Sequence, residues 1–284
     1  MNVASPLRYP GGKAAMADLL KQIRSLNGLG NYSIAEPFAG GAGASLSLLY
    51  QELAPEVMLN DLDPSIHAFW WAVTERNPQF LRMLANRRVS MAEWRRQRAI
   101  YRSTNATRLD RGFATFYLNR CNRSGIVMNG GPIGGTEQAG KWKLDARFNK
   151  TNLGARCKKV YEYRDRIRLS HGDGIDMIDQ VDIASVFLFV DPPYYVKGQT
   201  VYLNALTDQY HARIAEKLNG LGEAPWVLTY DDCPAIRKLY RGWANIRPFG
   251  LRYTASVRRS GKELLITPKH LRVPATQGSA ALSW

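Results

Sequence analysis

A short apolar run that ends at an acid and two prolines constrains the fold of this chain more than any other stretch. Residues 186–190 read Val-Phe-Leu-Phe-Val, and such a run is typical of a strand buried on both faces within a parallel sheet. Asp191 and two prolines follow directly. The acid is therefore predicted at the carboxyl end of a strand, where open α/β sheets bind their ligands.

The residues after this strand suit a planar ligand that carries an amino group. Pro192 and Pro193 have a fixed φ and no N–H donor, so the carbonyl groups around them are free to accept hydrogen bonds. Tyr194 places an aromatic ring beside the Asp191 carboxylate. The amino edge of adenine or cytosine fits this set, because it can donate to two oxygens while the base stacks on the ring. The alternative is that Asp191 only caps a turn.

The length and composition of the chain exclude several classes of protein. Its 284 residues suffice for one large α/β domain with an insertion or for two modest domains. The composition, 45% hydrophobic and 22% charged, is typical of a soluble globular protein. No apolar run approaches the roughly 20 residues that a membrane helix needs, and the amino terminus has no signal-peptide pattern. We therefore expect a cytoplasmic protein with no membrane partner.

The cysteines and histidines form no pattern that predicts a metal site. The three cysteines are widely spaced and include no C-x-x-C pair, which also argues against a disulfide framework. The four histidines show no H-x-x-x-H spacing. We therefore expect no bound metal.

The positive charge is concentrated in the middle of the chain. The net charge is +15, and residues 82–123 carry eleven arginines against two acids, while residues 141–168 carry ten lysines and arginines against three acids. A basic insertion in a nearly neutral remainder is typical of a nucleic-acid-binding module attached to an enzyme. Within it, Arg95 and Arg96 are candidate phosphate contacts. The alternative is a solvated, arginine-rich helix surface.

Glycine-rich turns near the amino terminus predict a nucleotide-type ligand. Gly40, Gly41 and Gly43 follow a short strand pattern and precede a helical one, so the backbone there can turn tightly and approach a ligand closely. Asp61 ends the next predicted strand, where an acid can accept both hydroxyl groups of a ribose. Asp63, which precedes a proline, is expected to cap the following helix.

A loop rich in asparagine, arginine and glycine follows the helical pattern that ends near residue 120. Asn and Arg side chains make bidentate contacts with adenine and guanine edges, so this loop is a candidate for reading bases. The candidate DNA contacts in and around it are Asn119, Arg120, Asn122, Arg123, Lys141 and Lys143.

Several motifs together resemble those of the Dam-type DNA adenine-N6 methyltransferases of the α group. The stretch Asp-Pro-Pro-Tyr at 191–194 resembles their catalytic motif, and Glu-Pro-Phe-Ala-Gly-Gly-Ala-Gly at 36–43 resembles their S-adenosylmethionine loop. Tyr-Pro-Gly-Gly-Lys at 9–13 resembles their amino-terminal cofactor motif, and residues 119–125 resemble their recognition region. The order of glycine loop, basic module and catalytic motif also matches the α group.

The resemblance implies a role for each matched residue. Tyr9 and Lys13 would line the methionine end of S-adenosylmethionine, and Asp173 would accept a hydrogen bond from its adenine amino group. The carboxylate and carbonyl oxygens of the catalytic motif would accept from the target amino group while its tyrosine stacks on the base. The catalytic set is then Asp191, Pro192 and Tyr194, and the cofactor-binding set is Tyr9, Lys13, Glu36, Phe38, Gly40, Gly43, Asp61, Asp173 and Asp191.

The same resemblance implies a Rossmann-like α/β methyltransferase sheet with an inserted helical DNA-recognition domain. We expect a catalytic domain from residues 1–68 and 160–284 around a mostly parallel sheet, with residues 69–159 as the recognition domain. The expected activity is methyl transfer to adenine N6 at a specific site in double-stranded DNA after base flipping. An enzyme for RNA or for cytosine N4, and a catalytically idle DNA-binding protein, remain alternatives. A cognate restriction enzyme fits as a partner, and the sequence predicts no oligomeric state.

Overall fold

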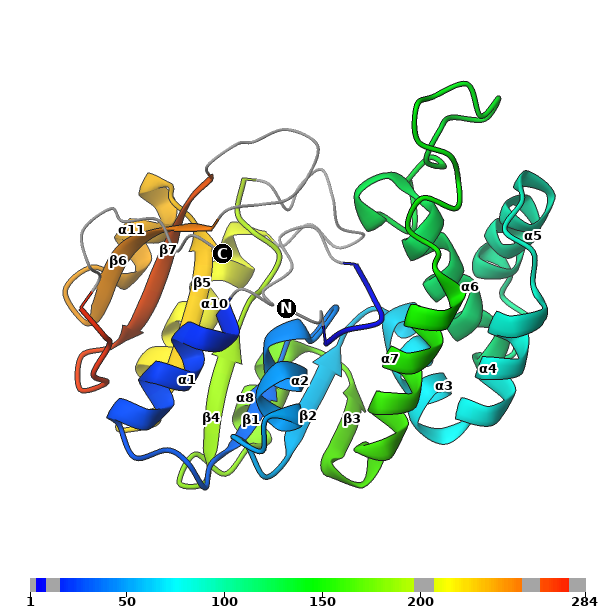
Figure 1. Ribbon diagram of the computed structural model, residues 1–284. Coiled ribbons are helices and arrows are strands. Elements are labelled where there is room, and N and C mark those ends of the chain that lie inside the picture. Colours follow the sequence, from blue (N-terminus) through cyan, green and yellow to red (C-terminus); the bar gives the residue numbers. More distant parts are fainter. Residues whose placement is uncertain (1–3, 9–15, 197–206, 252–260, 276–284) are drawn as a thin grey trace.

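A seven-stranded sheet in the order β3-β2-β1-β4-β5-β7-β6 forms the centre of the protein (Figure 1). The computed structural model describes residues 4–8, 16–196, 207–251 and 261–275. The strands are β1 (Ser33–Glu36), β2 (Val57–Asp61), β3 (Ile167–His171), β4 (Val186–Val190), β5 (Trp226–Asp231), β6 (Ala244–Leu251) and β7 (Gly261–Pro268). The apolar run 186–190 is thus a strand, and it lies in the middle of the sheet as its composition predicts.

The strand directions create a topological switch point, termed the crevice below, at the carboxyl ends of the parallel strands. Strands β1 to β5 run parallel, whereas β7 is antiparallel to β5 and β6 is antiparallel to β7. The chain winds outward from β1 in both directions, through β2 and β3 on one side and through β4 and β5 on the other. The register pairs Ala35 with Leu188, so the carboxyl ends of β1 and β4 lie side by side. Open α/β sheets bind ligands at such a switch point, and the predicted Rossmann-like, mostly parallel sheet is confirmed.

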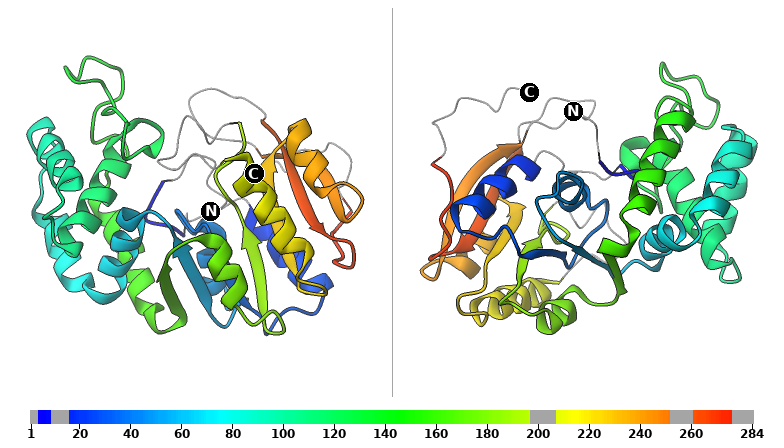
Figure 2. Two further views of the ribbon diagram at one scale, coloured as in Figure 1. Left: turned by 180° about the vertical axis from the view of Figure 1, so that it is seen from behind. Right: turned by 60° about the horizontal axis from the view of Figure 1, so that its bottom comes forward.

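Helices cover both faces of the sheet because its central strands are apolar on both faces. One face carries α1 (Ala17–Leu26) and α2 (Gly43–Tyr50), and the other carries α8 (Gly174–Gln180), α10 (Asp208–Asn219) and α11 (Pro234–Tyr240) (Figures 1 and 2). In β4, Phe187 and Phe189 pack toward α1 and α2, whereas Val186, Leu188 and Val190 pack toward the other three helices. This alternation buries every side chain of the strand.

A group of helices stands beside the β3 edge of the sheet (Figure 2). Its members are α3 (Pro64–Glu75), α4 (Asn77–Asn86), α5 (Met91–Arg102), α6 (Arg108–Cys121) and α7 (Lys150–Glu162). Phe69 of α3 stacks on Phe116 of α6 with ring centroids 5.9 Å apart, and Phe80 of α4 meets Phe113 edge to face at 5.4 Å. These aromatic contacts give the insertion a core of its own side chains, continuous with that of the sheet.

Caps and breaks divide residues 64–102 into the three helices α3, α4 and α5. Asp63 accepts from the backbone N–H of Ser65 at 2.7 Å and starts α3, as predicted. The side chain of Ser90 accepts from Glu93 N at 3.2 Å and starts α5. The predicted domain boundaries at 68/69 and 159/160 fall within α3 and α7, so both helices continue across them. The division into two domains stays a prediction.

Gly112 is expected to be essential for the contact between α6 and α3. A Cβ atom at this position would lie 2.4 Å from the carbonyl oxygen of Ala68, a backbone atom that cannot move alone. Gly112→Ala should therefore lower the free energy of unfolding by about 1–3 kcal/mol. Gly154→Ala in α7 is the matched control, because its Cβ would meet only leucine side chains at 3.8 and 4.0 Å.

Denaturant unfolding of both variants tests this packing. Gly154→Ala should leave stability unchanged or raise it by up to about 1 kcal/mol, because alanine favours the helix over glycine. Equal stability of the two variants would contradict the close approach of α3 and α6.

Candidate active site

Four acids gather where the parallel strands end. Glu36 is the last residue of β1 and Asp61 the last of β2, while Asp191 follows β4 directly and Asp173 lies two residues beyond β3. The four strands are consecutive neighbours in the sheet, so these acids lie in a row along the carboxyl ends of the parallel strands. The structure therefore brings together, from four distant stretches of the sequence, the acids that were predicted as site residues.

Glu36 is the most deeply buried of these acids. It is 4% exposed, and its Oε1 accepts from the backbone N–H of Ser45 at 3.2 Å and from the Ser45 hydroxyl. Burial raises the pKa of Glu36 to about 8, against the lowering effect of the Ser45 hydrogen bonds and with a further contribution from the charge of Asp191. The carboxyl group is thus held by the first turn of α2 and lies close enough to Asp191 to feel its charge.

Asp61 shapes the glycine-rich turn between β1 and α2. Its Oδ2 accepts from Gly40 N at 2.8 Å and its Oδ1 from Asp63 N at 2.9 Å. Gly40 has a φ of +45°, and Ala42, with a φ of +46°, leads into Gly43 at the start of α2. Burial raises the pKa of Asp61 to about 7, although both backbone hydrogen bonds lower it. The predicted ribose acceptor is thus fixed by the backbone that surrounds it.

Asp173 caps α8 and is held from a helix that the sequence did not implicate. It accepts from Ile175 N at 2.9 Å and from the hydroxyl of Tyr210 in α10. Beside it, the ring of Phe38 covers Gly174, where a Cβ atom would lie 2.5 Å from the ring. Phe38 and Asp173, both predicted as cofactor residues, therefore lie next to each other, and Tyr210 is an addition to the site.

Neighbouring strands fix the catalytic stretch. The hydroxyl of Thr229 in β5 donates to Asp191 Oδ1, and the hydroxyl of Tyr194 donates to Glu263 Oε2 in β7 at 2.8 Å. Asp231 at the end of β5 accepts from Tyr195 N at 3.0 Å and from Val196 N at 2.9 Å. Burial and the charges of Asp191 and Glu263 raise the pKa of Tyr194 well above its usual value, so it stays a donor. The stretch is therefore anchored from two strands at once.

Thr229, Asp231 and Glu263 were not predicted as site residues. Asp231 and its position at a strand end were visible in the sequence, and acids at strand ends were the signal that found Asp61 and Asp191. Glu263 gave no such signal, because its proximity to Tyr194 depends on the antiparallel pairing of β7 with β5. The predicted cofactor residues Tyr9 and Lys13 lie outside the described residues.

Five of the predicted DNA contacts lie on the surface. Arg95 and Arg96 are exposed on α5, and Arg123, Lys141 and Lys143 are exposed in the segment between α6 and α7. Trp142, which the sequence analysis did not single out, is 66% exposed, with the Lys141 ammonium 5.8 Å from its ring centroid. Exposed cations beside an exposed aromatic ring suit a nucleic-acid surface.

The other three predicted contacts are buried in the described structure. Asn119 pairs with the backbone of Arg8, accepting from its N–H at 2.7 Å and donating to its carbonyl, and it also donates to Gly125 O at 2.9 Å. Arg120 Nε donates to Pro6 O at 2.7 Å. Asn122 accepts from the Trp94 indole at 2.7 Å and donates to Ile126 O at 2.7 Å.

The positions of these three residues explain why they are not exposed. Each lies at or just beyond the carboxyl end of α6, on faces that pack against the amino-terminal segment and α5. Asn119, Arg120 and Asn122 are at most 6% exposed, so the described structure offers no base a free polar group from them. Their polar groups instead satisfy backbone groups and an indole that would otherwise be buried without partners.

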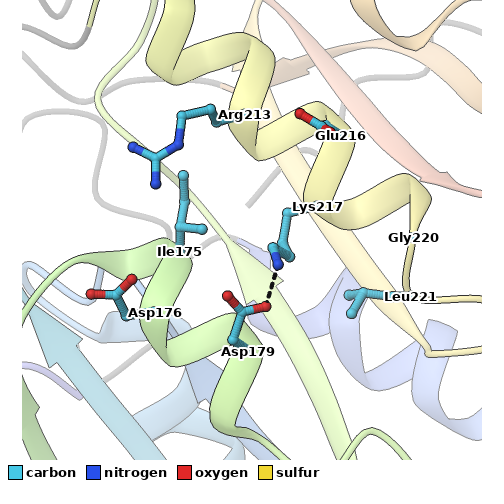
Figure 3. A pocket seen from close by; sticks show the side chains of 8 residues that line it. All are labelled: Ile175, Asp176, Asp179, Arg213, Glu216, Lys217, Gly220 and Leu221. Carbon is cyan, nitrogen blue, oxygen red and sulfur yellow. Dashed lines mark ion pairs between the residues drawn. The ribbon is translucent and has the colours of Figure 1, made fainter.

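A separate groove lies between α8 and α10 (Figure 3). Lys217 Nζ pairs with Asp179 Oδ1 at 2.5 Å across it, and Arg213 and Asp176 flank its other end. None of the predicted site residues lines this groove. Its lining carries bases as well as acids, which distinguishes it from the acids at the strand ends.

Two further features of the described residues bear on the class of protein. They contain no group of three or more His, Cys, Asp or Glu side chains arranged to hold a metal ion. None of the described helices has the length and apolar character needed to cross a membrane.

The parallel sheet with acids at its strand ends has a Rossmann-like architecture. The family model of the D12 class N6 adenine-specific DNA methyltransferases matches residues 9–254, and the chain belongs to this family. The protein is therefore an adenine-specific DNA methyltransferase, and its methyl donor is S-adenosylmethionine. The predicted family, enzyme class and cofactor are confirmed at this level.

Comparisons with individual proteins add little beyond the family. A search of curated proteins finds no match. A proposed RNA methyltransferase from Pyrococcus horikoshii is 13% identical with a TM-score of 0.39, over 92% of this chain and 85% of that one. The rRNA methyltransferase AviRa from Streptomyces viridochromogenes is 13% identical with a TM-score of 0.38, over 91% of this chain and 86% of that one. Likenesses this distant carry no argument about the substrate.

Asn119→Ala is expected to destabilise the protein in the absence of DNA. The substitution removes three hydrogen bonds and leaves the backbone groups of Arg8 buried without partners, which should cost about 2–4 kcal/mol. Arg123→Ala is the matched control, because Arg123 is exposed and its side chain makes no hydrogen bond among the described residues. It should leave stability within about 0.5 kcal/mol and weaken DNA binding. Urea unfolding measures the stability of both variants, and titration with DNA measures their binding. An unchanged stability of Asn119→Ala would contradict the structural role of its hydrogen bonds to Arg8 and Gly125.

Glu36→Gln is expected to remove part of the pH dependence of stability. A carboxyl group with a pKa of about 8 in the folded state, against about 4.3 in an unfolded chain, binds its proton more tightly when folded. Stability conferred by the protonated form is then fully present below about pH 4 and is lost as the pH rises through about 8. Urea unfolding at about pH 5 and about pH 8.5 measures the free energy of unfolding at each pH. As the pH rises between these values, this free energy should fall more for wild type than for the variant. Equal losses would contradict the raised pKa.

Proposed function

We propose that the protein methylates adenine N6 at a specific sequence in double-stranded DNA, and that the target base leaves the helix to be methylated. The observation that carries this proposal is the anchoring of Asp191 and Tyr194 at the crevice beside Glu36. A carboxylate, a rigid backbone and an aromatic ring held in this way suit a flipped base with an exocyclic amino group.

The proposed chemistry uses few groups of the protein. The adenine N6 lone pair is delocalised into the ring and is a poor nucleophile. The Asp191 carboxylate, which also accepts from Thr229, and the Pro192 carbonyl would accept from the two N6–H groups. These hydrogen bonds localise the lone pair toward the methyl group, and Tyr194 holds the plane of the base. N6 would gain the methyl group that the sulfonium loses as the carbon–sulfur bond breaks, and Asp191 would accept the proton that N6 releases.

The bound S-adenosylmethionine supplies an electrophilic methyl group on a sulfonium cation. The residues at the crevice fit this group: Asp61 would accept from the ribose hydroxyls and Asp173 from the adenine amino group, beside the ring of Phe38. The carboxyl groups of Glu36 and Asp191 would face the sulfonium, and a cation there offsets the cost of two neighbouring buried acids. The glycine turn at Gly40 and Gly43, and Tyr9 and Lys13, complete the proposed set.

The proposed DNA contacts lie beside this crevice. The basic helices and the projecting segment between α6 and α7 rise on the side of the sheet toward which the parallel strands point (Figure 1). Arg95, Arg96, Arg123, Lys141 and Lys143 are the exposed cations proposed to contact DNA. Because adenine N6 is paired inside a duplex, flipping would cost a few kcal/mol, which these contacts must offset.

Transfer of radiolabelled methyl from S-adenosylmethionine to unmethylated duplex DNA, followed by nucleoside analysis, tests the proposal. Label is expected in N6-methyladenine at one short sequence. Asp191→Asn should lower kcat at least about a hundredfold while DNA still binds. Asp179→Asn, which removes the same charge from the groove between α8 and α10, should retain activity.

Other outcomes would reject the proposal. Label in cytosine N4, or label only in RNA, would change the substrate. Undiminished turnover by Asp191→Asn would remove Asp191 from the chemistry, and DNA binding without any transfer would indicate an idle methyltransferase fold.

A further inference from the structure

The amino-terminal segment Ser5–Arg8 crosses the inserted helices at a junction rich in arginine. Figure 1 shows this segment, in dark blue, between the strand ends and α6. Arg120 of α6 donates to Pro6 O at 2.7 Å, and Arg156 of α7 donates to Ser5 O at 3.2 Å. Two guanidinium groups therefore meet at adjacent carbonyl groups of one short segment.

Asn119 and Gly125 fix the position of Arg8 at this junction. The Asn119 side chain pairs with the backbone N–H and carbonyl of Arg8, as a neighbouring strand would. A Cβ atom at Gly125 would lie 2.6 Å from Arg8 O, so the turn after α6 presses directly on the segment. The backbone of Arg8 is thus held by Asn119 on one side and by Gly125 on the other. The position of its Cα atom, from which the side chain extends, is therefore fixed.

Four arginines share this junction: Arg8, Arg120, Arg147 and Arg156. Burial and the charges of the other three lower the pKa of Arg120 to about 9. Burial, and after it the charge of Arg147, lowers the pKa of Arg8. Within the described ranges, none of the four forms an ion pair with a carboxylate. Elsewhere the same structure pairs its arginines with acids, as in Arg166 with Glu52 at 2.6 Å and Arg237 with Asp232 at 2.6 Å.

Like charges gathered without an acid are costly, above all where one of them is buried. Arg120 is only 6% exposed, and its Nε and Nη2 both donate to Pro6 O, which does not neutralise its charge. A multivalent oxyanion at the surface of the cluster would offset the repulsion and accept from several guanidinium groups at once. Arg8, Arg147 and Arg156 are the members that reach the surface.

We propose that this arginine junction, formed by Arg8, Arg147 and Arg156 above the buried Arg120, binds a phosphodiester group of the DNA substrate. The proposal rests on the proposed function, since it names where the backbone of the methylated DNA is held. The junction lies between the strand ends and the recognition helices, so a phosphate bound there positions the DNA strand beside the catalytic crevice. This site would contact the DNA backbone from the amino-terminal segment, in addition to the contacts proposed for the exposed cations of the insertion.

The salt dependence of DNA binding tests this site. The variants are Arg147→Gln/Arg156→Gln and the charge-retaining Arg147→Lys/Arg156→Lys, with Arg241→Gln, on the exposed end of α11 far from the junction, as control. Arg120 is left intact because its replacement would disturb buried hydrogen bonds, and thermal melting verifies that each variant folds. The plot of log K against log salt should become less steep by about 0.9 per lost phosphate contact in the Gln variant. The Lys variant and Arg241→Gln should keep the wild-type slope.

Parallel measurements separate this inference from the proposed function. Methyl transfer by the wild-type protein to duplex DNA tests the proposed function. Absence of this transfer would reject the proposed function, independently of the results for the arginine variants. A folded Gln variant with the wild-type slope would overturn the arginine junction alone. A second anion, the carboxylate of S-adenosylmethionine, is tested by calorimetry with the cofactor. Weaker cofactor binding by the Gln variant with an unchanged DNA slope would assign the junction to that carboxylate and also overturn the proposal.

Discussion

The parallel pairing of β1 with β4 is the contact on which the rest of the site depends. These strands are distant in the sequence, and the whole helical insertion lies between them. Their pairing puts Glu36 and Asp191 at neighbouring strand ends and opens the crevice where the chain reverses its winding. Because both strands are buried on both faces, a one-residue slip would turn Phe187 and Phe189 to the wrong helices, so the hydrophobic core itself fixes the register.

Electrostatics at this crevice is unfavourable until a ligand arrives. Glu36 and Asp61 have raised pKa values because they are buried together with other acids, and their hydrogen bonds to Ser45 and Gly40 only partly compensate. In the proposed complex, a cationic cofactor bound beside these acids would remove this cost, which would favour a sulfonium over a neutral ligand. Groups with perturbed pKa values are common at functional sites.

The arginines of the helical insertion differ in their exposure to solvent. Arg95, Arg96 and Arg123 have the exposure that a phosphate contact requires, whereas Arg120 lies beneath the amino-terminal segment and works as a structural donor. Asn119 and Asn122 likewise serve the backbone around α6. Residue types that read bases in a complex are also those that satisfy buried backbone groups, and only burial separates the two roles.

The sequence by itself determined the strands, the glycine turn, the acids at strand ends, the basic insertion and, by resemblance, the family. It did so because these features depend on local pattern: an apolar run, a turn residue, an acid that follows. Only the tertiary structure decided that Thr229, Asp231 and Glu263 anchor the catalytic stretch, that Tyr210 holds Asp173, and that Asn119 and Arg120 are buried. Those facts depend on which strands become neighbours and which face of α6 meets the amino-terminal segment, and such long-range pairing leaves no local signal in the chain.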